Sequence, residues 1–131
     1  MAKKTRYAEP RSACDYGIDI TDTKKWQHYL DKSKGGRPIC IISSWIYWDI
    51  TYQAEDVQKL KERGFLPAAI FSENLIWDEQ DRWSPGSCVK TTWLKRFEFN
   101  CIFHTQNTTY LLVGAGTRCP ISPGMFNSIH F

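Results

Sequence analysis

Apolar side chains recur at helical spacing in two stretches of the chain. The first covers residues 22–34, where residues 21–23 offer capping side chains and the glycines at 35 and 36 supply a stop. The second begins near Thr51, carries acidic residues in its first turn and basic residues in its last, and ends at Gly64. The pattern therefore predicts two amphipathic helices in the first half of the chain.

The remaining apolar positions follow the pattern of strands. Residues 37–48 are β-branched or aromatic on both parities, which indicates a strand buried on both faces. Four further strands are predicted between short polar turns, over 67–77, 88–97, 101–106 and 110–113. Connections this short join antiparallel strands, because parallel pairing needs a crossover of roughly a dozen residues.

Together these elements predict one α+β domain over 1–131. It comprises an N-terminal arm (1–20), a helix–strand–helix unit (21–65), a β-meander (66–118) and an irregular tail (119–131). Several apolar residues of the tail are expected to dock on the sheet, namely Met125, Phe126, Ile129 and Phe131. We expect a strongly bent antiparallel β-meander, SH3-like or a partly open small barrel, covered by two helices.

Composition and charge narrow the class of protein. With 42% hydrophobic and 24% charged residues, the 131-residue chain suits one globular domain. No apolar run approaches the roughly 20 residues of a membrane span, so we expect a cytoplasmic protein with no membrane partner. The net charge of +3 is too small to indicate nucleic-acid binding by itself. The charges are sorted along the chain into a basic, an acidic and a basic third. Basic and acidic residues number 9 and 5 over 1–37, 4 and 8 over 38–83, and 4 and 1 over 84–131.

No spacing in the sequence indicates a catalytic or metal centre. The Cys and His that lie closest in sequence, Cys101 and His104, are three residues apart on a predicted strand and so face opposite sides. The acidic pairs stand beside turn signals, where carboxylates are usually solvated. We therefore predict that the protein is not an enzyme and uses no cofactor and no metal ion.

Binding chemistry is better represented, on the strand predicted from residue 88. Lys90 and Arg96 share one parity there, and Trp93 and Lys95 share the other. Rings interleaved with cations on a curved sheet can hold single-stranded nucleic acid, and the same residue types anchor protein interfaces. The alternative is that the rings fill the core. The candidate binding residues are Lys90, Trp93, Lys95, Arg96 and Arg118.

Part of the chain resembles a known family. The residues that carry the likeness are 69–71, Asp78 with Arg82, 85–92, Phe97 and 103–118. Over 66–118 the sequence is similar to a family of small prophage and phage proteins of gammaproteobacteria. The resemblance implies an origin in a mobile genetic element, and it implies no activity that could be assigned to single residues.

These observations give one leading hypothesis and two alternatives. A slightly basic protein of mobile-element origin without reacting groups is expected to be a non-catalytic binding protein in the bacterial host cell. Its most concrete form is an anti-CRISPR-like inhibitor that occludes a surface of a host protein or ribonucleoprotein complex. The alternatives are a nucleic-acid-binding small β-barrel and a self-associating structural phage protein. The sequence leaves the oligomeric state open.

Overall fold

The computed structural model describes residues 12–33 and 36–130. Within them lie eight strands, one 3-10 helix and three α-helices, which confirms the predicted α+β class. In chain order the elements are β1 (Ser12–Cys14), η1 (Ile20–Asp22), α1 (Thr23–Ser33), β2 (Ile39–Ile50), α2 (Ala54–Glu62), β3 (Ala68–Asp78), β4 (Val89–Lys90), β5 (Arg96–Glu98), β6 (Ile102–His104), β7 (Thr109–Leu112), β8 (Gly116–Ile121) and α3 (Pro123–Ser128).

Strand β2 is central to the sheet, as its apolar sequence predicts. Along one edge it pairs antiparallel with β3. Along the other edge it has two successive parallel partners, with β7 opposite residues 39–42 and β8 opposite residues 46–50. The sheet therefore divides near Ser44, which has a positive φ of 49°.

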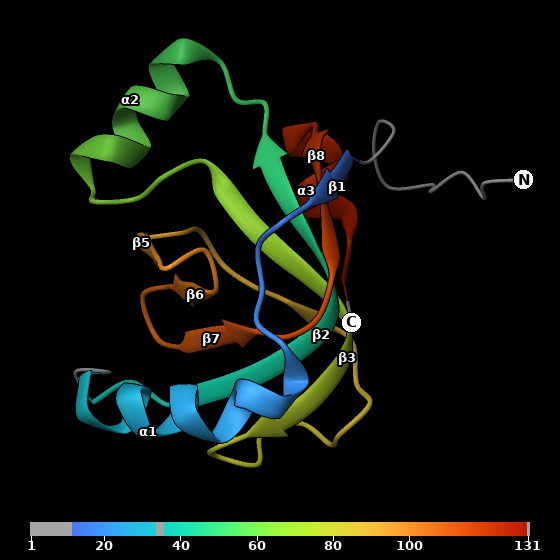
Figure 1. Ribbon diagram of the computed structural model, residues 1–131. Helices are drawn as coiled ribbons and strands as arrows, with labels where there is room; N and C mark the ends of the chain where they lie inside the picture. Colours follow the sequence, from blue (N-terminus) through green and yellow to red (C-terminus); the bar gives the residue numbers. More distant parts are fainter. Residues whose placement is uncertain (1–11, 34–35, 131) are drawn as a thin grey trace, which may run out of the picture.

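Trp45 fills the point of division. Its indole N–H donates a hydrogen bond of 3.1 Å to the carbonyl oxygen of Gly114. Its ring lies directly against Gly116, where an added Cβ would come within 2.3 Å of a ring carbon. The segment after β1 crosses here too, because Ile18 N–H bonds to Leu112 O and Gly114 N–H bonds to Ile18 O. In Figure 1 this blue segment runs from β1 toward α1 in front of the sheet.

The rest of the sheet is antiparallel and open. Strands β5, β6 and β7 follow one another in order beside β2, and β4 pairs with β3 on the opposite side of β2. Within the described residues, β1 and β5 end the longest path of paired strands and do not pair with each other. Figure 1 shows how strongly β2 and β3 curve. The expected strongly bent sheet is thus confirmed, with an open rather than a closed outline.

Three groups of buried side chains hold the layers together. One joins residues of β2, β3, β6 and β7, and includes Trp45, Tyr47 and Phe103. A second packs α3 against β2, β3 and β8, and a third packs α1 against β2 and β7. Helix α2 contributes one buried residue, Leu60, and stands apart from the sheet in Figure 1.

The strand predicted over 88–97 is interrupted in the structure. Of this range, only β4 and the beginning of β5 form strands. They belong to different parts of the sheet, since β4 pairs with β3 and β5 pairs with β6. Residues 91–95 connect the two parts. The prediction that alternate residues of one strand form a single basic face was therefore wrong.

Two further expectations need correction. The sheet is mixed rather than wholly antiparallel, because β2 runs parallel to β7 and β8. The tail over 119–131 is not irregular, because it holds the end of β8 and then α3, whose N-cap Ser122 accepts a hydrogen bond from the Met125 amide. Phe126 and Ile129 do dock on the sheet, as predicted, while Met125 is exposed and Phe131 lies outside the described residues.

The predicted N-terminal arm is only partly covered. Residues 1–11 of the arm lie outside the described residues. The next three residues form β1, which pairs antiparallel with β8, and Gly17 and Ile18 bond to the sheet through their backbone. The described part of the arm is therefore an integral part of the fold.

Candidate binding groove

Strand β4 is hydrogen-bonded along one edge. It pairs with β3, where Lys90 lies opposite Phe71, and it has no second partner among residues 12–33 and 36–130. The amide of the next residue, Thr91, donates to the carbonyl oxygen of Ile70 over 2.9 Å. Backbone groups alternate in direction along an antiparallel ladder, so Lys90 directs its own N–H and C=O away from β3. The outer edge of β4 thus presents backbone groups that no other described residue pairs with.

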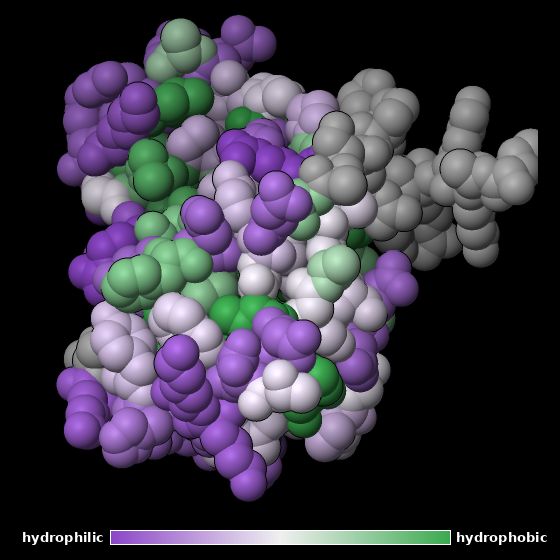
Figure 2. Space-filling view, viewed as in Figure 1, coloured by the Kyte–Doolittle hydropathy of each residue, from purple (hydrophilic) through white to green (hydrophobic). Residues whose placement is uncertain are grey.

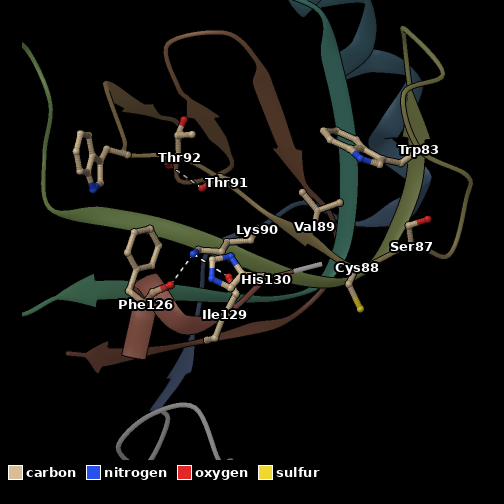
Figure 3. Close-up of a pocket in the computed structure, with 11 residues that line it drawn as sticks. Trp83, Ser87, Cys88, Val89, Lys90, Thr91, Thr92, Phe126, Ile129 and His130 are labelled. Atoms are coloured by element: carbon tan, nitrogen blue, oxygen red, sulfur yellow. Dashed lines mark hydrogen bonds between the residues drawn. The ribbon is translucent and has the colours of Figure 1, made fainter. Parts of the chain in front are cut away.

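A groove of about 780 Å³ lies beside this edge (Figure 3). Val89, Phe126 and Ile129 are buried and form its apolar part, whereas Cys88 and His130 are exposed. In Figure 3 the helix side of the groove, with Phe126, Ile129 and His130, faces the strand that carries Val89 and Lys90. Its full lining is Trp83, Ser87, Cys88, Val89, Lys90, Thr91, Thr92, Trp93, Phe126, Ile129 and His130.

Lys90 holds the helix side of the groove in place. Its ammonium donates to the carbonyl oxygens of Phe126 and, over 3.0 Å, of Ile129 (Figure 3). These oxygens belong to the C-terminal end of α3, where a cation is favourable. The ammonium also lies 4.2 Å from the centre of the Phe126 ring, and burial lowers the pKa of Lys90. Lys90 therefore acts first as a support of the groove.

Trp93 lies between this groove and a second hollow of about 370 Å³ beside α2. Its indole N–H donates to the Tyr52 hydroxyl over 3.0 Å. The Arg63 guanidinium lies 5.6 Å from the ring centres of both Trp93 and Phe65, and the Lys95 ammonium lies 5.6 Å from that of Phe65. In the described chain no carboxylate is within ion-pair distance of either cation. A small aromatic and basic patch, the patch around Trp93, therefore consists of Arg63, Phe65, Trp93 and Lys95.

Arg96 belongs to a different network, around the buried His104. The His104 Nε2 lies 2.5 Å from the Glu98 carboxylate, and Arg37 donates to Nδ1 over 3.0 Å, so Nε2 carries the proton. Arg96 bonds to the same carboxylate over 3.1 Å. Burial lowers the pKa of His104 below 6.5, assisted by the charges of Arg96 and Arg37 and opposed by the hydrogen bond to Glu98.

Arg118 lies in a third place, on β8. It donates two hydrogen bonds of 2.7 and 2.8 Å to the Asp49 carboxylate and a third to the Tyr16 hydroxyl. Its guanidinium also lies 4.6 Å from the centre of the Tyr47 ring. The hydrogen bonds with Asp49 raise the pKa of Arg118 above its ordinary value. This network ties β8 to β2 and to the N-terminal segment.

The five predicted binding residues are thus divided among several sites. Lys90 and Trp93 line the groove, and Trp93 and Lys95 belong to the aromatic and basic patch. Arg96 and Arg118 are engaged in separate internal networks. Sequence reasoning missed the groove residue Trp83 and the patch residue Arg63, because the exposure that distinguishes both is set by the fold and has no local signal in the sequence.

Figure 2 shows the distribution of hydrophobic side chains on one face of the molecule. Its hydrophobic side chains gather in small areas separated by hydrophilic ones. Among the residues that the structure describes, no group of His, Cys, Asp and Glu is placed to hold a metal ion. None of the helices in that part of the chain is long and apolar enough to cross a membrane.

The fold and the groove define a class of protein, an α+β domain with an open mixed sheet and a groove beside a strand that is free on one edge. The chain belongs to the family described as "domain of unknown function (DUF6957)", whose model matches residues 16–128. The match extends from the segment before η1 to the end of α3. The comparisons with curated proteins and with solved structures give no match.

Proposed function

We propose that the protein is a non-catalytic binding protein that holds a segment of a partner protein in the groove beside β4 and thereby covers part of the partner's surface. The observation that carries this proposal is the combination of a groove of about 780 Å³ with the free edge of β4. Grooves of this size, with a mainly apolar lining and a few polar groups, are typical of binding sites. An exposed Trp at the rim, Trp83, suits the anchor residue of an interface.

Charge favours a protein over a nucleic acid as the ligand. Nucleic-acid sites concentrate unpaired cations along a path for phosphates. Here Arg96 and Arg118 are paired with Glu98 and Asp49, and Lys90 is bonded to backbone carbonyl oxygens. Of the candidate binding cations, Lys95 in the patch around Trp93 is the one with neither a carboxylate nor a carbonyl partner in the described chain, and the second hollow beside it also contains Asp56.

The concrete form of this proposal is inhibition of a host defence complex by a protein encoded in a prophage or phage. The groove would then take up a segment of a host protein or ribonucleoprotein complex and block the surface that this segment belongs to. The supporting features are the resemblance over 66–118 and the small size of the chain.

Alkylation of Cys88 tests the proposal directly. Of the five cysteines, Cys88 is the exposed one, and it lies in the groove, while Cys40, Cys101 and Cys119 are buried. We expect a purified ribonucleoprotein effector of a bacterial defence system to co-elute with the protein and to slow alkylation of Cys88. Trp83→Ala should weaken this binding at least tenfold, whereas Phe99→Ala, at an exposed ring outside the groove, should leave it unchanged.

Two results would contradict the proposal. In one, no defence effector slows alkylation of Cys88. In the other, the protein binds an oligonucleotide with steep salt dependence, and this binding survives Trp83→Ala and is lost with Arg63→Ala and Lys95→Ala. The second result would establish the nucleic-acid alternative at the patch around Trp93 instead.

A further inference from the structure

The outer edge of β4 has the hydrogen-bonding groups of a sheet that could accept another strand. Lys90 directs its backbone N–H and C=O away from β3, as the bond between Thr91 and Ile70 requires. Toward the N-terminus, Cys88 is the next residue whose backbone N–H and C=O point away from β3. The Ser87 carbonyl oxygen just before it points toward β3, because it accepts a hydrogen bond from the Leu75 amide. Both Cys88 and Lys90 line the groove, so a ligand in the groove reaches this edge.

Strand edges in folded proteins are usually guarded against such pairing, often by a lysine that projects over the edge. The lysine of β4 does not do this. The Lys90 side chain is directed to the carbonyl oxygens of Phe126 and Ile129, on the opposite wall of the groove. The edge therefore stays accessible, and the same contact keeps α3 at the side of the groove.

The charge of the groove indicates what such a strand would carry. Lys90 and His130 are the titratable nitrogen-bearing residues of the lining, and the lining contains no Asp and no Glu. The Lys90 ammonium uses two of its three N–H groups internally, which leaves one donor for a ligand. Phe126 and Ile129 offer apolar contacts to every second side chain of an extended peptide, on the face of β4 to which the Lys90 side chain also points.

From these observations we infer that the partner segment binds as an added strand on the outer edge of β4, and that it is an extended peptide with alternating apolar side chains and at least one carboxylate near Lys90. This inference rests on the proposed function, because it names the form of the ligand in the same groove. Recognition through backbone hydrogen bonds, with side-chain pockets for specificity, is an established mode of peptide binding.

A peptide selection provides the probe. Random linear peptides displayed on a carrier would be selected on the full chain, and an enriched sequence would be synthesised in its plain form and with single N-methyl groups along its backbone. We expect methylation to weaken binding about tenfold at alternate positions and hardly at all at the positions between them, since only alternate amides face β4. Hydrogen exchange of the Lys90 amide should slow when the peptide is bound.

Variants of the protein supply the matched control. Cys88→Pro removes an outward N–H without removing a bond to β3, whereas Cys88→Ala keeps that N–H. We expect Cys88→Pro to weaken peptide binding several-fold more than Cys88→Ala does, and the amide exchange of β3 should show that both variants are folded. Replacing the acidic residue of the peptide by its amide should weaken binding by a similar factor.

The outcomes separate the two levels of the proposal. Peptides that compete with the defence effector and protect Cys88, yet tolerate methylation at every position and leave exchange of the Lys90 amide unchanged, would overturn strand addition alone. If no peptide is enriched on the unmodified chain over the Trp83→Ala variant, strand addition is likewise wrong. If in addition the effector leaves Cys88 open to alkylation, the proposed function fails with it.

Discussion

Cations meet aromatic rings at two places on this sheet, with different consequences. At the first, Arg118 bonds to the Asp49 carboxylate and the Tyr16 hydroxyl and lies over Tyr47. At the second, around Trp93, the cations lie over rings without a carboxylate partner in the described chain. The same residue types thus make an internal tie in one place and leave hydrogen-bonding capacity for a partner in the other.

Strands β2 and β4 differ in the same way. Strand β2 has partners along both edges, and at its point of division the Trp45 ring fills the space and bonds to Gly114. Strand β4 has one partner and lies beside a groove. Stability should therefore be concentrated at the division of β2 and around Arg118, and binding beside β4. Variants at each of these places test whether stability and binding are separated in this way.

The largest loss of stability is expected from Gly116→Ala. The added Cβ would come within 2.3 Å of the Trp45 ring, which cannot move without leaving its place between β7 and β8. Overpacking of this kind lowers the free energy of unfolding by about 1–3 kcal/mol or more. Denaturant unfolding measures the effect. Gly124→Ala is the matched control, because its Cβ meets nothing within 4 Å, and it should be neutral or slightly stabilising.

The His104 network should make stability depend on pH. Burial lowers the pKa of His104 in the folded protein below 6.5, so the unfolded chain binds this proton more tightly. The contribution of His104 is therefore complete above about pH 6.5 and is lost as pH falls through the lower folded value. Unfolding free energy measured against pH should decrease in this window. The decrease should be smaller in His104→Gln, and an unchanged slope in that variant would contradict the assignment.

Most of the elements could be predicted from the sequence, because their signals are local. Helical spacing located α1 and α2 to within a few residues, and the apolar run of β2 identified the central strand. Strand β8 was missed because its sequence, which begins with Gly116 and includes Pro120, has little strand character. It is held by parallel pairing with the distant β2 rather than by local pattern.

The site was less predictable, for a physical reason. The residues over 88–97 have the composition of one strand, and only tertiary pairing divides them between β4 and β5. The groove exists because α3 docks beside β4 through contacts between Lys90 and carbonyl oxygens 36 and 39 positions away. Single-sequence reasoning identified Lys90 and Trp93 as unusual, but it could not specify which surface would lie opposite them.

A smaller effect is expected from the pair of Arg118 and Asp49. The two side chains are 41% and 42% exposed, so solvent screens much of their attraction. A double-mutant cycle with Arg118→Met and Asp49→Asn should give a coupling free energy of about 1 kcal/mol or less. The coupling should shrink with added salt. A value near zero at low salt would mean that the ring contacts of Arg118, rather than the ion pair, join β8 to β2.

The smallest change of stability is expected at Trp83, the residue whose loss should matter most for binding. The Trp83 ring is 44% exposed. The Arg82 guanidinium beside it is held by hydrogen bonds to Asp78 and Thr108, which do not depend on the ring. Trp83→Ala should therefore lower the free energy of unfolding by less than about 0.5 kcal/mol. Arg82→Ala is the contrasting variant, because it leaves the Asp78 carboxylate, which is 1% exposed, without its guanidinium partner.

Calorimetric or denaturant unfolding of the two variants tests whether the Trp83 ring contributes to stability. A loss at Trp83→Ala as large as that at Arg82→Ala would mean that the indole supports the loop between β3 and β4, as Tyr47 and Trp45 support the other side of the sheet. The ring would then be explained by packing, and its exposure would no longer support a binding role. If the free energy of unfolding falls only slightly, packing does not explain the large exposed Trp83 ring beside the groove, and a role in binding does.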